Sequence, residues 1–274
     1  MVAEAQVLVL ELSRRPHRKE LAGMPENWFA RIGDFLGGWP DDYLVLDLET
    51  QGLDQFSTTT LPLEFGWCLV ENRSVVSDGA VVLDWTRYPR VDLDWLATTM
   101  EKTRNAMVAR GLTYPFDISH LQTHGVDPRE AITAARRLVK ESLAARYRIV
   151  GHNLYAFDRP LLERSFASYI RKPLLVPPDA VLDTGMIEKA RMLKTYPPSP
   201  GELAVRSWYD KIRRANNRVR WNMSEHCART YGLPVDITEA HAAGYDCRIN
   251  HLLVERMRKL STEVYCGAQS QAPG

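Results

Sequence analysis

Two acidic residues, Asp47 and Glu49, close a short apolar stretch, and their spacing suits metal chemistry. Residues 43–48 are β-prone and mostly apolar, which predicts a buried strand. Side chains of a strand alternate between its faces, so the two carboxylates point the same way. Side by side they repel each other and lose solvation, and a bound cation relieves both effects. Oxygen ligands alone favour Mg²⁺ or Mn²⁺. The alternative is a strand that ends at the surface, where Gly52 turns the chain.

Two later segments carry the same kinds of residue at the predicted starts of helices. The first follows a predicted strand at 148–151 and reads Gly-His-Asn-x-x-x-Phe-Asp, ending at Asp158. The second places His241 and Asp246 where the last predicted helix begins. The chain therefore offers four acids and one histidine, each at the end of a strand or the beginning of a helix.

This ordered set resembles the DnaQ-like 3′-5′ exonucleases of the DEDD superfamily. Asp47-x-Glu49 matches the first motif, Asp158 the second, and His241-x-x-x-x-Asp246 the third. The residues at 63–66 and 182–184 agree with minor features of the family, and the resemblance covers about residues 42–259. A histidine five residues before the last Asp is typical of the histidine branch, DEDDh.

The resemblance implies a two-metal mechanism with Mg²⁺ or Mn²⁺, in which ions roughly 4 Å apart stabilise the attacking and leaving oxygens. By the family pattern, Asp47 bridges both ions. Glu49 and Asp246 complete the ion that holds the nucleophilic water, and Asp158 holds the other. His241 is the implied general base, because an unperturbed histidine has a pKa of about 6.5.

The resemblance also implies which residues bind the substrate. Thr50, Gln51, Gly52 and Leu53 are expected to line a pocket for the 3′-terminal nucleotide, with Leu53 against the base. Asn153 and Phe157 are expected as supporting contacts. The alternative for Leu53 and Phe157 is a place in the core.

The elements that must position these residues can be read from periodicity. Three strands come first, at 43–48, 63–70 and 75–85, and the last two form a hairpin. Helices are predicted over 93–108, from 127 to about 145, from 158, over 183–193 and over 243–260, with a loop at 111–125. Strands followed by alternating helices and strands indicate an α/β mixed sheet flanked by helices. The resemblance makes that sheet RNase H-like.

We expect an N-terminal appendage at 1–40, an exonuclease domain at 41–260 and a flexible tail at 261–274. Within the appendage, residues 25–36 predict a helix that packs on the main domain. An insertion at about 194–220 carries Lys and Arg with aromatic residues between them. Such a segment can grip phosphates and stack bases, and the alternative is a solvated charged helix. Its residues of interest are Arg206, Lys211, Arg213, Arg214, Arg218 and Arg220, with Trp208, Tyr209 and Trp221.

Composition sets the outer bounds. The chain has 274 residues and a formal net charge of +1, so no global field draws it to nucleic acid or to a membrane. No apolar run is long enough to span a bilayer, and the N-terminus does not read as a signal peptide. The four cysteines are scattered, which predicts neither zinc nor disulfides and fits a cytoplasmic location.

The prediction is therefore a metal-dependent 3′-5′ exonuclease that acts on single-stranded nucleic acid with a free 3′ end, with DNA slightly favoured over RNA. Three alternatives stay open at this point. One is an RNA-trimming exonuclease of the same family, and another is a non-catalytic nucleic-acid-binding module on this fold. The third is an RNase H-like endonuclease, against which the spacing of His241 and Asp246 argues.

Overall fold

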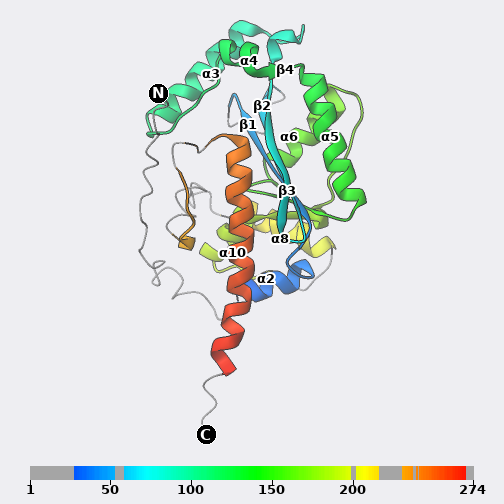
Figure 1. Ribbon diagram of the computed structural model, residues 1–274, viewed down its shortest axis with the longest axis vertical. Coiled ribbons are helices and arrows are strands. Elements are labelled where there is room, and N and C mark those ends of the chain that lie inside the picture. The colour runs from blue at the N-terminus through cyan, green and yellow to red at the C-terminus, as the bar shows by residue number, and fades with distance from the viewer. Residues whose placement is uncertain are drawn as a thin grey trace, which may run out of the picture.

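The computed structural model describes residues 28–52, 59–198, 202–215, 230–236, 239 and 241–269 (Figure 1). The strands are β1 (Tyr43–Thr50), β2 (Pro62–Glu71), β3 (Ser74–Leu83), β4 (Gly125–Val126), β5 (Arg148–Gly151) and β6 (Val181–Asp183). The helices are α2 (Trp28–Leu36), α3 (Leu93–Val108), α4 (Ile118–His124), α5 (Pro128–Ala144), α6 (Asp158–Ser168), α7 (Thr184–Met192), α8 (Glu202–Arg214) and α10 (Ala243–Gln269), with short 3₁₀ turns at Trp85–Arg87 and Pro178–Ala180.

The strands form one mixed sheet in the order β4-β3-β2-β1-β5-β6. The β1–β2 and β2–β3 pairs are antiparallel, and β1–β5, β5–β6 and β3–β4 are parallel. This arrangement confirms the predicted α/β mixed sheet, and it places β1 at the centre.

The two faces of β1 are covered by different helices. Glu49 lies opposite Glu64 and Asp47 opposite Gly66 in the β1–β2 register, and α10 packs over this face. On the other face, α5 and α6 pack on Leu48, which lines a small apolar cavity with residues of both helices. In Figure 1, α10 runs along one side of the sheet as a long orange-to-red helix, while α5 and α6 lie on the other side. The acids of β1 therefore face the helix whose first turn carries Asp246 and which His241 directly precedes.

Helix starts agree with the local sequence signals. The Asp127 side chain accepts hydrogen bonds from the amides of Arg129 and Glu130, and Pro128 occupies the first turn of α5. Asp183 caps α7 by accepting from the amide of Met186. Capped starts of this kind fix where each helix begins relative to the strand before it.

Helix α2 is part of the core, as the apolar spacing predicted. Trp28, Phe29 and Ile32 are each less than 5% exposed. Phe35 packs edge-on against Trp208 of α8, with ring centroids 5.1 Å apart. The remainder of the predicted appendage, residues 1–27, lies outside the described residues.

Burial in α8 contradicts base stacking by Trp208 and Tyr209, whereas Trp221 lies outside the described residues. Trp208 is 3% exposed and Tyr209 is fully buried. With Val205 and Ile212 they form the inner face of an amphipathic helix, at the spacing i, i+3, i+4, i+7. Lys211 and Arg214 point to solvent on the outer face. Within α8, the exposed cationic side chains are therefore the groups that a nucleic acid can contact.

Two element boundaries differ from the sequence prediction. Residues 118–124, expected as loop, form α4, because Asp117 caps its first turn by accepting from the amide of His120. The last helix was expected to end at 260, but α10 continues through Gln269, since no Pro interrupts it. Within the described part of the chain, no helix is both long enough and apolar enough to cross a membrane.

Candidate active site

The strand β1 brings Asp47 and Glu49 to the face that α10 covers. Both side chains are half-buried near the end of a strand whose residues 43–46 are fully buried. A buried strand holds its side chains in fixed directions. Asp47 and Glu49 therefore point to the same face of β1, as the alternation of side chains along a strand predicted.

Asp158 joins this pair from the start of α6. It is only 3% exposed, and its Oδ1 accepts a hydrogen bond of 3.1 Å from the backbone amide of Leu48. Leu48 lies between Asp47 and Glu49 in the chain, so this bond ties the third acid directly to the first two.

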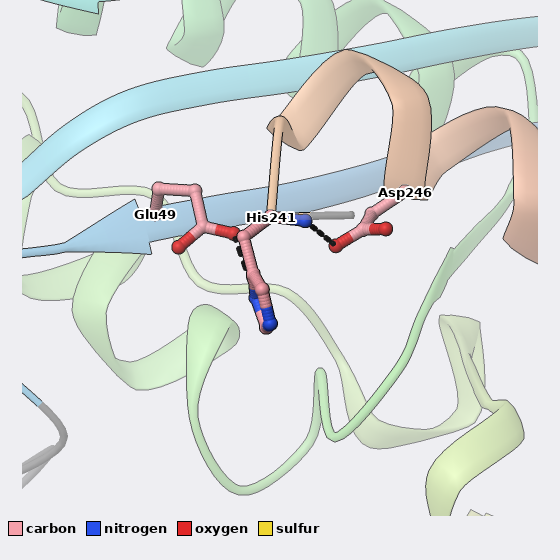
Figure 2. Close-up of side chains that lie close together, drawn as sticks. All are labelled: Glu49, His241 and Asp246. Carbon is pink, nitrogen blue, oxygen red and sulfur yellow. Dashed lines mark hydrogen bonds and ion pairs between the residues drawn. The ribbon is translucent and has the colours of Figure 1, made fainter. Parts of the chain in front are cut away.

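The last two residues come from the start of α10, with His241 just before the helix and Asp246 in its first turn (Figure 2). The backbone amide of His241 donates to Oδ2 of Asp246 at 3.3 Å. Nδ1 of the His241 ring lies 3.7 Å from Oε1 of Glu49, the pair joined by a dashed line in Figure 2. His241 has a φ of 72°, a left-handed conformation that costs a non-glycine residue of order 1–3 kcal/mol and that clusters at functional sites.

Burial, with repulsion from neighbouring carboxylates behind it, dominates the electrostatics of the acids. Burial, and then the nearby charge of Asp158, raises the pKa of Asp47 well above its ordinary value. Burial also raises the pKa of Asp158. For Asp246, burial and the charge of Glu49 raise the pKa to about 7. The protein alone therefore holds these carboxylates in a state that favours protonation, and a cation would reverse that preference.

His241 is shifted by its acidic partner. Its interaction with Glu49 raises the pKa of His241 above the ordinary value, and burial opposes this change. The ring is therefore held close to the carboxylates by charge as well as by the backbone.

These residues fit a divalent cation. One ligand atom each from Glu49, His241 and Asp246 lie within 4.8 Å of one another. Oδ1 of Asp246 and Nε2 of His241 are buried and have no hydrogen-bond partner among the residues that the structure describes. Buried polar atoms are normally satisfied, so such atoms next to a carboxylate cluster suit a cation or its water.

The residues after β1 form an internally bonded turn. Gln51 is 2% exposed, its Nε2 donates to the carbonyl of Thr59 and its Oε1 accepts from the amide of Leu61. Thr50 is also buried, and its hydroxyl donates to the carbonyl of Gly52 at 2.6 Å. Leu53, the expected contact to the base, lies outside the described residues.

The other expected substrate contacts are spread around the site. Phe157 is half-buried immediately before α6, and Asn153 is exposed with a φ of 60°. Arg213 lies 3.6 Å from Asp210 in an ion pair on α8, and Arg214 is exposed. Arg218 belongs to the part of the insertion that the structure does not describe.

Sequence reasoning treated Asp183 only as a helix cap, whereas the structure gives it a wider role. The fully buried carboxylate accepts from the amides of Asn153 at 3.0 Å, Tyr155 at 2.8 Å and Met186 at 2.9 Å. It thereby ties the loop before Asp158 to the start of α7. Its place at the end of a strand was visible in the sequence, but its partners depend on how the two loops meet.

Comparison with known proteins finds similarity in structure only. No protein-family model and no curated protein matches the sequence. Among solved structures, the zinc-bound form of the E. coli exonuclease I complex with single-stranded DNA is similar with a TM-score of 0.52 and 11% identity. E. coli exonuclease I in complex with a 5cy-dT13 oligonucleotide is similar with a TM-score of 0.51 and 12% identity.

Both alignments cover 84% of this chain and 43% of the exonuclease I chain, so this protein spans less than half the length of the enzymes that it resembles. At such identity the likeness speaks for the fold. The chain has the fold of the DnaQ-like 3′-5′ exonucleases.

Proposed function

We propose that this chain is a metal-dependent 3′-5′ exonuclease that hydrolyses single-stranded nucleic acid, with DNA favoured slightly over RNA. The observation that carries the proposal is the convergence of acids from three distant parts of the chain. Glu49 on β1 and Asp246 on α10 meet at His241, and Asp158 is bonded to the backbone between Asp47 and Glu49. An exonuclease I-like fold with this set intact favours catalysis over a purely binding role.

The acids Asp47, Glu49, Asp158 and Asp246 would hold two divalent ions, Mg²⁺ or Mn²⁺. When bound, such ions stabilise the charge that develops on the attacking and leaving oxygens of a phosphodiester. The protein's contribution is to hold four carboxylates rigidly on a buried strand and two helix starts. The raised pKa values of Asp47, Asp158 and Asp246 indicate that holding these carboxylates ionised costs free energy in the metal-free protein.

His241 is proposed as the general base. Nε2, the ring nitrogen not engaged by Glu49, takes the proton of the attacking water. Glu49, at Nδ1, stabilises the imidazolium that results. The raised pKa of His241 is consistent with this stabilisation.

We place the 3′-terminal nucleotide beside the end of β1, near Thr50, Gln51, Gly52 and Leu53. The buried side chains of Thr50 and Gln51 shape this turn, so the contact with substrate falls to its backbone and to Gly52. Among the described residues, a Cβ at Gly52 would meet only Thr99 Cγ2, at 3.8 Å.

Two further groups of residues are proposed to contact the nucleic-acid strand whose 3′-terminal nucleotide occupies this site. Asn153 and Phe157, on the loop before α6, complete the proposed pocket. On α8, Arg213 and Arg214 are proposed, together with Arg218, to attract the phosphates of the incoming strand.

The test uses linear single-stranded DNA and RNA of equal length, a duplex and a circular single strand, with the linear strands labelled at the 5′ end. We expect a stepwise ladder from linear single strands in Mg²⁺ or Mn²⁺, and none in excess EDTA. Asp47→Asn should abolish the ladder, whereas Asp34→Asn, at an exposed position on α2, should not. Cutting of the circle would indicate an endonuclease. Tight binding without cleavage by the wild-type protein would indicate a binding module.

A further inference from the structure

The first turn of α10 rests directly on the backbone of β2. A Cβ built on Gly66 would lie 2.3 Å from the carbonyl carbon of Ala243 and 2.6 Å from the amide nitrogen of Gly244. No side chain fits in that space, so glycine is required at position 66 for the helix to approach this closely. Gly244 continues the contact on β3, where its Cβ would lie 3.2 Å from the carbonyl oxygen of Gly79.

A carboxylate on the same strand bonds to the same turn. Glu64 lies two residues before Gly66 and therefore points to the same face of β2. Its Oε2 accepts a hydrogen bond of 2.7 Å from the backbone amide of Ala243, the first residue of α10. The first amides of a helix have no partner within the helix, and an anion is favoured at this end by the helix dipole.

This contact lies next to the carboxylates of the site. Glu64 is directly opposite Glu49 in the β1–β2 register, and Gly66 is directly opposite Asp47. His241 and Asp246 lie two residues before and three residues after Ala243. The hydrogen bond from Ala243 to Glu64 therefore anchors the start of α10 between these two site residues.

We propose that Glu64 is a positioning residue for the nuclease site, which fixes the start of α10 so that His241 and Asp246 meet Glu49. The catalytic consequence of this inference rests on the proposed function. The placement of the start of α10 by Glu64 does not depend on the proposed function. It assigns Glu64 to the backbone of Ala243 and not to an ion. A metal-ligand role for Glu64 is the alternative that the experiment must separate.

The substitutions Glu64→Gln, Glu64→Asp and Glu64→Ala separate the two roles. A glutamine oxygen still accepts from the amide of Ala243, whereas aspartate is one methylene too short and alanine has no acceptor. A positioning role predicts that the Gln variant stays within several-fold of wild type while the Asp and Ala variants are impaired. A ligand role predicts the opposite ranking, because Asp retains a carboxylate and Gln does not.

Two quantities are measured for each variant. The first is kcat and KM on a 5′-labelled single strand, where we expect kcat of the Ala variant to fall by about 10–100-fold with KM nearly unchanged, as for a small misplacement of catalytic groups. The second is the affinity for Mn²⁺ measured by electron paramagnetic resonance without substrate, where we expect the same order of variants. Glu71→Ala is the matched control, because Glu71 is on the same strand and also loses a hydrogen bond, the one from Tyr147.

Wild-type kcat and Mn²⁺ affinity in folded Glu64→Ala protein would overturn the proposal, and so would a Gln variant as impaired as the Ala variant. If Glu64→Ala does not fold, the Gln and Asp variants still decide between the two roles. A wild-type protein without nuclease activity on any substrate would refute the proposed function, whereas the Mn²⁺ measurement would still test Glu64.

Discussion

His241 faces Glu49 across the junction of α10 and β1, with 3.7 Å between Nδ1 and Oε1. Because the carboxylate favours the imidazolium, the pKa of His241 is raised above its ordinary value. We expect nuclear magnetic resonance titration of the metal-free protein to give a pKa for His241 above the ordinary histidine value of about 6.5. In Glu49→Gln the difference should shrink or reverse, since burial then acts alone. An unchanged pKa in that variant would contradict the pairing.

Loss of the histidine should reduce the chemical step and leave binding nearly intact. We expect His241→Ala to lower kcat by about 10²–10⁴-fold, because the variant removes a proton acceptor and no metal-holding carboxylate. Single-strand affinity, measured in Ca²⁺ to suppress turnover, should change little. Cleavage by His241→Ala at the wild-type rate would mean that another group takes the proton.

The stability of the metal-free protein should fall as pH rises. Asp246 has a pKa of about 7 in the folded protein, against 3.8 ordinarily. Between these values the folded state binds more protons than the unfolded state, so the free energy of unfolding decreases with pH over that window. Mg²⁺ favours the ionised carboxylates, and its stabilising effect should therefore be larger at pH 8 than at pH 5.5. Thermal melts in EDTA and in Mg²⁺ at the two pH values measure this. Asp246→Asn should flatten the dependence.

The cationic side chains on the outer face of α8 should contribute to the affinity for single-stranded nucleic acid through their charge alone. In a variant with Arg213, Arg214 and Arg218 changed to Ala, each lost phosphate contact should weaken the dependence of log K on log salt by about 0.7 on a single strand. KM should rise on long strands and stay constant on a dinucleotide, with kcat unchanged at saturation. An unchanged salt slope on a long strand would leave α8 as a solvated charged helix without a substrate role.

Asp183 should matter for stability and for the placement of Asp158. Its carboxylate accepts from three backbone amides, and asparagine offers one oxygen and a donor that faces an N–H. We expect Asp183→Asn to lower the free energy of unfolding by about 1–3 kcal/mol for each amide left without a partner. Urea unfolding measures the loss. Asp179→Asn, a substitution just before β6, provides the comparison.

Much of the fold could be predicted because it depends on local pattern, whereas the convergence of the acids was expected from the family resemblance. The period of two placed Asp47 and Glu49 on one face, and caps such as Asp127 and Asp183 marked where helices begin. The aromatic residues of α8 were a different case. Their spacing with Val205 and Ile212 is that of a buried helix face. The neighbouring Lys and Arg residues favoured the interpretation as a nucleic-acid contact instead.

The role of Glu64 could not be read from the sequence. An acid on a strand is normally a solvent-facing residue, and only the close approach of α10 over Gly66 turns it into a cap. The partners of Gln51 are hidden for the same reason, since they depend on the path of the turn after β1. Tertiary contacts of this kind leave no periodic signal.

The packing of α10 on β1 also bears on the order in which parts of the protein fold. Tyr43 at the beginning of β1 bonds to His251 of α10, a partner 208 residues away in the chain. Contacts of such separation close a very long loop and form late, after the local elements. The acids of β1 therefore meet their partners on α10 only when the rest of the sheet is in place. In refolding, recovery of Mn²⁺ binding should lag behind recovery of helical circular dichroism, so that ion binding reports the completion of the fold.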